Sequence, residues 1–280
     1  MNCSRIESRT GLWGVAWPYN PCAMPRRDRR HFYAKPDPRA GEGLWLYGLH
    51  AVRAALANPA RKTRRIVLTA RAAEELGPKL LARVRQEIVE TDAVAKLLPT
   101  SAVHQGAALQ CDPLPRRDLE TLLSAPANGR RLVVVLDQVG DPQNAGAILR
   151  AAAAFRADCV VAQDRHAPPE SGALAKAASG ALDIVPYAQV VNIARTLEQL
   201  GKLGFWRIAL AGDAEGPIED AVAEGDIALV LGSEGSGIRR LVRERCDASA
   251  FVPIDRGMES LNVSSAAAIA LYEVRRSERR

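Results

Sequence analysis

Residues 132–155 read LVVVLDQVGDPQNAGAILRAAAAF, and their pattern indicates the fold class. It begins with an apolar run that ends at Asp137, as in strands that are covered on both faces. The Asp-Pro pair at 141–142 favours a turn, and we expect Asn144 to cap a helix that continues to about Phe155. A buried strand, a turn and a helix in succession are typical of a parallel α/β sheet.

The same alternation continues to the C-terminus. We expect further strands at 158–163, 183–188, 207–212, 226–232 and 250–254 and helices near 171–181, 192–204, 238–246 and 260–276. This order predicts an open, mostly parallel sheet with helices on both faces. Ligands of such sheets bind outside the carboxyl ends of the strands, so we look for chemistry in the loops after Asp137, Ala211, Leu231 and Ile254.

A smaller α/β domain precedes this sheet. The pattern predicts a strand and a helix within 44–58, a strand at 64–70, one amphipathic helix over 72–88 and a strand at 103–111. We therefore divide the chain into a tail at 1–42, a small domain at 43–112, a linker at 113–129 and a large domain at 130–280. The tail mixes Arg, Pro and Gly without a sustained period, so we expect it to be basic and disordered.

The charge of the chain is unevenly placed. Its net charge is +6, yet residues 1–40 alone carry 8 Lys or Arg against 3 Asp or Glu. Net charge therefore supports RNA binding by the tail, and a binding surface on the nearly neutral body must come from local patches. The candidates are Arg61, Lys62, Arg64 and Arg65, for which a solvated loop is the alternative interpretation.

Several function classes find no support in the sequence. No apolar run reaches the roughly 18 residues of a membrane-spanning helix. The five cysteines form no CxxC pair and the histidines no HExxH motif, so we expect neither a metal site nor a disulfide framework. Cys159 and Cys246 lie in or beside apolar runs and are expected to be small buried hydrophobes. We place the protein in the cytoplasm, or in mitochondria if Arg5, Arg9 and the nearby serines form a transit peptide.

Two further loops carry polar residues at ends of predicted strands. In LVLGSEGSGIRRL, residues 229–241, glycines flank Glu234 before a helix start, where an anion or nucleotide could bind. The order is GxxGxG and no P-loop lysine follows, so a dinucleotide or ATP site is not indicated. In VPIDRGMESLNVSSAAAIALYEVRR, residues 252–276, we expect Ser260 to cap the closing helix.

Together the three loops resemble the three signature motifs of the SpoU (TrmH-like) family of RNA methyltransferases. Asn144 with Arg150 resembles the first motif, the run 232–237 the second, and the run 260–264 the third. The resemblance implies transfer of a methyl group from S-adenosylmethionine to a ribose 2′-hydroxyl of RNA. It also implies a C-terminal trefoil knot and a homodimer whose active site forms near the subunit interface.

The small domain extends this resemblance. YGLHAVRAAL at 47–56 and VHQGAAL at 103–109 are similar to the ribosomal-protein-like RNA-binding domain of one branch of the family. That branch methylates a guanosine of 23S-type rRNA, and His104, Gln105 and Gly106 are the most telling residues. The resemblance therefore implies a guanosine of large-subunit rRNA as the substrate.

The resemblance also implies roles for single residues. Arg150 would orient the 2′-hydroxyl and stabilise the developing oxyanion, because a guanidinium is a poor base. The other catalytic candidates, which would orient Arg150 and the target nucleotide, are Asn144, Glu234, Ser260 and Asn262. Backbone groups would bind the cofactor around Gly212, Leu231, Gly232, Val252, Ile254 and Leu261. No metal is required.

Three alternatives remain at this point. A tRNA could replace rRNA as the substrate, although the small domain favours rRNA. A non-catalytic RNA-binding or ribosome-assembly protein of the same fold would be expected to lack Arg150, Asn144 or Asn262, and all three are present. A doubly wound oxidoreductase would be expected to carry GxGxxG after its first strand, and this chain does not.

Overall fold

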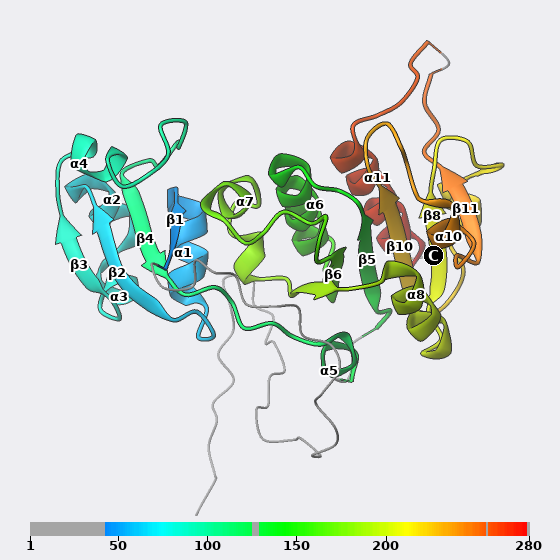
Figure 1. The fold of residues 1–280 in the computed structure, drawn as a ribbon, viewed down its shortest axis with the longest axis horizontal. Coiled ribbons are helices and arrows are strands. Elements are labelled where there is room, and N and C mark those ends of the chain that lie inside the picture. Colours follow the sequence, from blue (N-terminus) through cyan, green and yellow to red (C-terminus); the bar gives the residue numbers. More distant parts are fainter. Residues whose placement is uncertain (1–42, 125–128, 256, 279–280) are drawn as a thin grey trace, which may run out of the picture. The chain divides into compact units, whose positions relative to one another are not determined.

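The structure is a computed structural model that describes residues 43–124, 129–255 and 257–278. Within these residues the chain forms two sheets (Figure 1). One has four strands in the order β1-β4-β2-β3, and the other has seven in the order β7-β6-β5-β10-β8-β11-β9. The predicted tail, with the residues considered as a transit peptide, lies outside the described residues.

The seven-stranded sheet is parallel at every strand pair, which confirms the predicted architecture. Its central strands, β5 and β10, are buried along their whole length, because helices cover both faces of the sheet. Its strands are β5 Leu132–Asp137, β6 Cys159–Gln163, β7 Tyr187–Val190, β8 Trp206–Leu210, β9 Gly216–Pro217, β10 Ile227–Gly232 and β11 Ala248–Phe251.

The helices divide between the two faces of this sheet, as the core clusters show. Alternate residues of β5 point to opposite faces, with Val134 in one apolar cluster and Val135 in the other. The first face carries α6 Pro142–Ala154, α7 Gly172–Ala177, the 3-10 helix η1 Ala181–Asp183, α9 Ile218–Ala221 and α11 Val263–Ser277. The second carries α5 Leu119–Leu123, α8 Ile193–Lys202 and α10 Arg240–Arg243.

The four-stranded sheet lies in the predicted small domain. Strand β4 pairs antiparallel with β1 and β2, and β2 pairs parallel with the edge strand β3. Helix α1 packs its apolar side, including Val52 and Leu56, into the main core. The elements are β1 Leu44–Tyr47, α1 Leu49–Ala57, β2 Thr63–Leu68, α2 Ala70–Leu76, α3 Pro78–Leu81, β3 Arg85–Ile88, α4 Thr91–Ala95 and β4 Ala107–Cys111.

Two predicted elements were wrong. The single helix over 72–88 is instead α2, α3 and the strand β3, because Gly77 ends α2 at a positive φ of 79° and Pro78 begins α3. The predicted strand at 183–188 starts only at Tyr187. The preceding residues form η1 and a turn, which bury Leu182 and Val185 in the core.

Both predicted helix caps were also wrong. Asp141 caps α6, with its carboxylate accepting a hydrogen bond from the backbone N–H of Asn144 at 3.0 Å, and Pro142 occupies the first helical position. Asn262 rather than Ser260 caps α11, and its side-chain oxygen accepts from the N–H of Ser264 at 2.9 Å. Because Asp141 caps α6, the Asn144 side chain is free to accept a hydrogen bond from Asn262.

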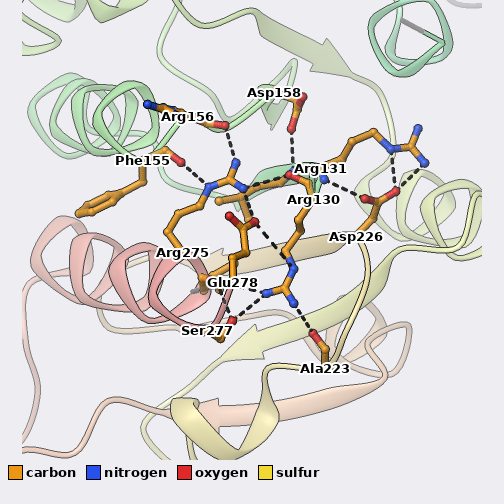
Figure 2. Close-up of polar contacts among 12 residues, drawn as sticks. Arg130, Arg131, Phe155, Arg156, Asp158, Ala223, Asp226, Arg275, Ser277 and Glu278 are labelled. Carbon is orange, nitrogen blue, oxygen red and sulfur yellow. Dashed lines mark hydrogen bonds and ion pairs between the residues drawn. The ribbon is translucent and has the colours of Figure 1, made fainter. Parts of the chain in front are cut away.

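Helix α11 is fixed at its C-terminal end by arginines (Figure 2). The Arg275 guanidinium donates to the backbone carbonyls of Phe155, Arg156 and Arg130 at 2.7, 2.6 and 3.0 Å. Arg130 in turn donates to the Ser277 hydroxyl at 2.8 Å. These bonds join the end of α11 to the end of α6 and the start of β5. They lie at the amino edge of the sheet.

The same region makes stability depend on pH. Burial raises the pKa of Asp158, whose carboxylate accepts the N–H of Leu132 at 2.7 Å (Figure 2). Because the folded-state pKa lies above the unfolded value, this group stabilises the fold most at low pH, and that contribution is lost as pH rises through the folded pKa. We expect Asp158→Asn to gain stability relative to wild type from pH 4 to pH 7, by less than about 1 kcal/mol. Urea unfolding at both pH values measures this, and a relative loss at pH 7 would contradict it.

Candidate active site

The loops that carry the three motifs leave neighbouring strands. Strands β5, β10, β8 and β11 are adjacent in that order and all parallel, so their carboxyl ends lie along one edge of the sheet. The segments that follow them are 138–141, 233–239, 211–215 and 252–262. The fold therefore gathers the motifs at the edge where ligands of such sheets bind.

One residue from each motif meets at a single hydrogen-bonded cluster. The side-chain amide of Asn262 donates to the Asn144 amide oxygen at 2.9 Å and to the Glu234 carboxylate at 2.6 Å. The amide oxygen of Asn262 accepts from the backbone N–H and the hydroxyl of Ser264 at 2.9 and 2.6 Å. Both ends of this side chain are thus used, which fixes its orientation. We call Asn144, Glu234 and Asn262 the polar trio.

The loop of the second motif is folded back onto its own strand. Ser233 and Gly237 exchange two backbone hydrogen bonds of 3.2 and 3.0 Å, and Gly235 and Gly237 have positive φ angles of 88° and 65°. A Cβ added to Gly232 would overlap the backbone of Gly237 and Ile238. The glycines therefore allow a tight loop that presents Glu234 to Asn262.

This tightness leads to a prediction about Gly232. An alanine there must displace the backbone of residues 237–238, so we expect Gly232→Ala to lower the free energy of unfolding by about 1–3 kcal/mol. Gly216→Ala is the matched control, because nothing lies within 4 Å of its added Cβ. Chemical denaturation of both variants measures the difference, and equal stability of the two would show that the loop yields freely.

A buried ion pair anchors the far end of the same loop. Asp137, fully buried at the end of β5, accepts hydrogen bonds from the backbone N–H and the guanidinium of Arg239 at distances from 2.5 to 2.9 Å. The guanidinium also donates to the Gln163 amide oxygen at 2.9 Å. Asp137 and Arg239 were not among the site residues predicted from the sequence. A carboxylate at the end of an otherwise apolar strand was the signal that could have found them.

Two predicted catalytic residues make no hydrogen bond or ion pair with the polar trio in the described part of the chain. Arg150 is exposed on α6, roughly 9 Å along the helix axis from Asn144, and within the described residues it makes no hydrogen bond or ion pair. Ser260 is also exposed, two residues before the cap of α11. A ligand or a second chain can reach both side chains.

The predicted cofactor residues lie along three adjacent loops. Leu231 is 1% exposed, packs in the core and lies near the carboxyl end of β10, so its side chain is not available to a ligand. Gly212 has open space where its Cβ would be, and Ile254 is 38% exposed. The described residues between Val252 and Leu261, which leave out residue 256, form no helix or strand. The exposed apolar side chain of Ile254 and the open space at Gly212 are compatible with a flat, partly apolar nucleoside such as the adenosyl group.

The charge near these loops is locally balanced. The Arg243 guanidinium donates to both carboxylate oxygens of Asp213 at 2.9 and 2.7 Å, and this hydrogen bonding lowers the pKa of Asp213.

The described residues contain no group of His, Cys, Asp and Glu that could hold a metal ion. In the same part of the chain, no helix is both long and apolar enough to cross a membrane.

The described cysteines are free thiols. Cys159 is fully buried, as predicted, and burial raises its pKa. Cys246 is half-buried, and burial raises its pKa to about 12. Neither thiol is available as a thiolate nucleophile at neutral pH.

Comparison with known proteins identifies the family. Residues 131–272 match the SpoU rRNA Methylase family, and residues 45–117 match the RNA 2'-O ribose methyltransferase substrate binding family. The chain belongs to the SpoU rRNA methylase family. The first match contains the whole polar trio, and the second covers the four-stranded sheet.

Relatives of known sequence and structure agree with this membership in the SpoU family. The chain is 38% identical over 248 residues to the 23S rRNA (guanosine-2'-O-)-methyltransferase RlmB of Coxiella burnetii, covering 82% of this chain and 94% of that one. A putative RNA methyltransferase of the TrmH family from Porphyromonas gingivalis superposes with a TM-score of 0.66 at 27% identity, covering 84% and 90% of the two chains. The SpoU methyltransferase AviRb from Streptomyces viridochromogenes, solved with AdoMet, shares the fold with a TM-score of 0.71 at 20% identity, covering 85% and 91%.

Proposed function

We propose that this protein transfers a methyl group from S-adenosylmethionine to the ribose 2′-hydroxyl of a guanosine in 23S rRNA. The observation that carries the proposal is the polar trio, which brings one residue from each signature motif to the ligand-binding edge of the sheet. The substrate follows from relatives such as the Coxiella burnetii enzyme, of which this chain covers 94%. The matched substrate-binding family over residues 45–117 supports RNA as the acceptor.

The chain's residues would act mainly by positioning the acceptor. Methyl transfer to a hydroxyl is an in-line displacement, and correct orientation can lower such a barrier by about 7–11 kcal/mol. Arg150 would orient the 2′-hydroxyl and stabilise the charge that develops on it, because its guanidinium stays protonated. The polar trio, with the exposed hydroxyl of Ser260, would hold the target nucleotide.

The cofactor would lie in the loops after β8, β10 and β11. S-adenosylmethionine supplies the electrophilic methyl group when bound. Backbone groups would hold its adenosyl part around Gly212, Leu231, Gly232, Val252, Ile254 and Leu261. The exposed side chain of Ile254 and the open space at Gly212 support this placement.

We also propose that the C-terminal part is threaded into a trefoil knot. Three observations on the sheet and its closing helix support this threading. Strand β10 lies between β5 and β8, whereas the later β11 lies beyond β8. Helix α11 then returns across the sheet to pack against α6 and β10.

A homodimer would complete the site. Helix α11 packs on α6 and exposes Ile269 and Tyr272, which are 39% and 51% exposed and three residues apart. Apolar side chains at this spacing form one helix face that a second copy can cover. The exposed Arg150 lies on the neighbouring helix α6, so such an interface would bring it close to a partner chain.

The proposed function is tested with labelled S-adenosylmethionine and purified 23S rRNA, 16S rRNA and tRNA. We expect label only in 23S rRNA, recovered after nuclease digestion as 2′-O-methylguanosine. Label in tRNA instead of 23S rRNA would show that tRNA is the substrate. Cofactor binding without transfer to free RNA would point to an assembly intermediate, and absence of cofactor binding would favour a non-catalytic RNA-binding protein.

The polar trio makes a separate prediction about Asn262. The carboxylate of an Asn262→Asp variant would still cap α11 as an acceptor, but it could not donate to Asn144 or Glu234. We expect kcat to fall about 10²-fold because the nucleotide site is displaced. The melting temperature should stay near that of wild type. Ser265→Ala, on the exposed face of the same helix, is the control, and equal kcat of the two variants would exclude the trio from catalysis.

A further inference from the structure

A short segment lies between the small domain and the catalytic helix α6 (Figure 1). This bridge segment, residues 170–183, contains α7 and η1. Helix α7 packs against β1 of the four-stranded sheet on one side and against α6 on the other, and η1 packs against both α1 and α6. The bridge segment is therefore in contact with both the small domain and α6.

A buried ionic cluster ties the bridge segment to the small domain. The guanidinium of Arg61 is fully buried and donates to both carboxylate oxygens of Asp183, at 2.9 and 3.0 Å, and to the Glu170 carboxylate. Asn58 donates a further bond to Asp183 at 3.0 Å. Glu170 also accepts the backbone N–H of Leu114, in the linker, at 2.9 Å.

This cluster overturns one interpretation of the basic patch. The sequence makes Arg61 a candidate for an exposed RNA-binding surface, but its side chain is not exposed at all. Burial alone would lower the pKa of Arg61, and the hydrogen bond and charge of Asp183 instead raise it above its ordinary value. Arg61 is therefore a charged group between two domains and is out of reach of a bound RNA.

The motif around Gln105 forms a second contact between the small domain and the bridge segment. The side-chain oxygen of Gln105 accepts hydrogen bonds from the Lys176 ammonium on α7 at 2.5 Å and from the backbone N–H of Leu49 at 3.3 Å. Gln105 has a positive φ of 52°, a conformation that is uncommon for residues other than glycine. The motif at His104, Gln105 and Gly106 was predicted from the sequence to belong to an RNA-binding domain. Its Gln105 contacts α7 at the boundary between the two domains.

Glycines remove the remaining space between the bridge segment and its neighbours. A Cβ on Gly172 would lie 2.5 Å from the carbonyl oxygen of Trp45 in β1. A Cβ on Gly180 would lie 2.9 Å from the carbonyl oxygen of His50 in α1. On the other side, a Cβ on Gly146 of α6 would lie 2.8 Å from the backbone nitrogen of Ala178. The bridge segment thus touches backbone on both sides.

We propose that the bridge segment holds the small domain at one fixed distance and orientation from α6, so that it selects which ribose of a bound RNA reaches the active site. Arg61, Gln105 and Gly172 are then positioning residues, which act through RNA placement and do not touch the reacting atoms. The inference rests on the proposed function, because it concerns where an RNA held by the small domain presents its 2′-hydroxyl. Close backbone packing makes this geometry resistant to continuous deformation.

The first test measures the geometry without any catalysis. Spin labels are attached at Ser101→Cys in the small domain and Lys202→Cys on α8, in a chain whose Cys3, Cys22 and half-buried Cys246 are replaced by serine. We expect one narrow distribution of label distances for this parent chain. Gly172→Ala should shift it, and Gln105→Asn, whose shorter side chain cannot reach Lys176, should broaden it. Gly216→Ala, with open space around its added Cβ, should match the parent.

The second test measures methyl transfer on two RNAs. On 23S rRNA we expect Gly172→Ala to lower kcat/KM about 10²-fold or to move the methyl group to a neighbouring ribose. Transfer to a short oligonucleotide that contains the target but cannot reach the small domain should not change, nor should the Kd for S-adenosylmethionine. Gln105→Asn, which should fold even if Gly172→Ala does not, should widen the set of methylated riboses.

Two outcomes would overturn the inference. One is a broad distance distribution in the parent chain. The other is a shifted distribution in Gly172→Ala with the same ribose of rRNA methylated at the wild-type rate. Absence of transfer to any RNA by the wild type would instead contradict the proposed function, and the label distances would still decide whether the placement is fixed.

Discussion

Replacing Arg150 with alanine is expected to lower kcat for methyl transfer to RNA by about 10³-fold, because it would remove the donor that we propose for the developing oxyanion. The side chain is exposed and makes no hydrogen bond or ion pair with the described residues, so its loss should not disturb folding. The Kd for S-adenosylmethionine should also be unchanged, since α6 is separate from the proposed cofactor loops. Single-turnover transfer to 23S rRNA and isothermal titration with the cofactor measure these two quantities.

Two further variants separate the chemistry of Arg150 from its charge. Arg150→Lys keeps the positive charge but loses the planar fork of donors, so we expect it to recover only part of the lost rate. Lys202→Ala removes one positive charge from the end of α8, at the opposite edge of the sheet, and should leave kcat unchanged. If Arg150→Ala and Lys202→Ala weakened RNA binding equally with no effect on kcat, Arg150 would be a phosphate contact and not a catalytic residue.

The parallel sheet was predictable because its strands are buried on both faces. The run at 132–137 is apolar up to its final Asp137, and the structure buries every residue of it. A continuous apolar run of this length can be assigned to a buried strand without knowledge of tertiary contacts, because a strand with a solvent-exposed face would alternate apolar and polar residues. The polar trio required more: the three loops that carry Asn144, Glu234 and Asn262 were each weak signals alone, and only their joint resemblance to the SpoU motifs indicated a shared site.

Contacts between distant segments were not predictable from pattern. Arg61 has the sequence context of a solvated basic loop, and its burial depends on Asp183, which lies 122 residues away. The strand β3 was predicted as helix because 72–88 has helical spacing, yet β2 offers it a parallel edge to pair with. Local propensity decides only where tertiary partners do not compete with it. The predicted cap of α6 was wrong because Asp and Asn are both favourable capping residues, and the sequence did not show which of Asp141 and Asn144 begins the helix.

Removing the guanidinium of Arg239 is expected to cost about 3–5 kcal/mol of folding free energy, because Asp137 would stay buried with only one backbone donor. The Arg239 side chain is 39% exposed, so water can enter the space it leaves, and we expect Arg239→Met to lie near the lower end of that range. Even about 3 kcal/mol is a large share of the 5–15 kcal/mol that typically separates folded from unfolded domains. Guanidinium unfolding measures the change.

A double variant tests whether the pair stabilises the fold or mainly positions the loop that follows Gly232. In Asp137→Leu/Arg239→Met both charges are gone, so stability should return to within about 1 kcal/mol of wild type, as for other buried ion pairs replaced by apolar residues. Arg239 also holds Gln163, and that bond cannot be restored by apolar packing. We therefore expect the double variant to fold well and yet transfer methyl groups slowly. Full activity in it would mean that the loop presents Glu234 to Asn262 without help from β5 and β6.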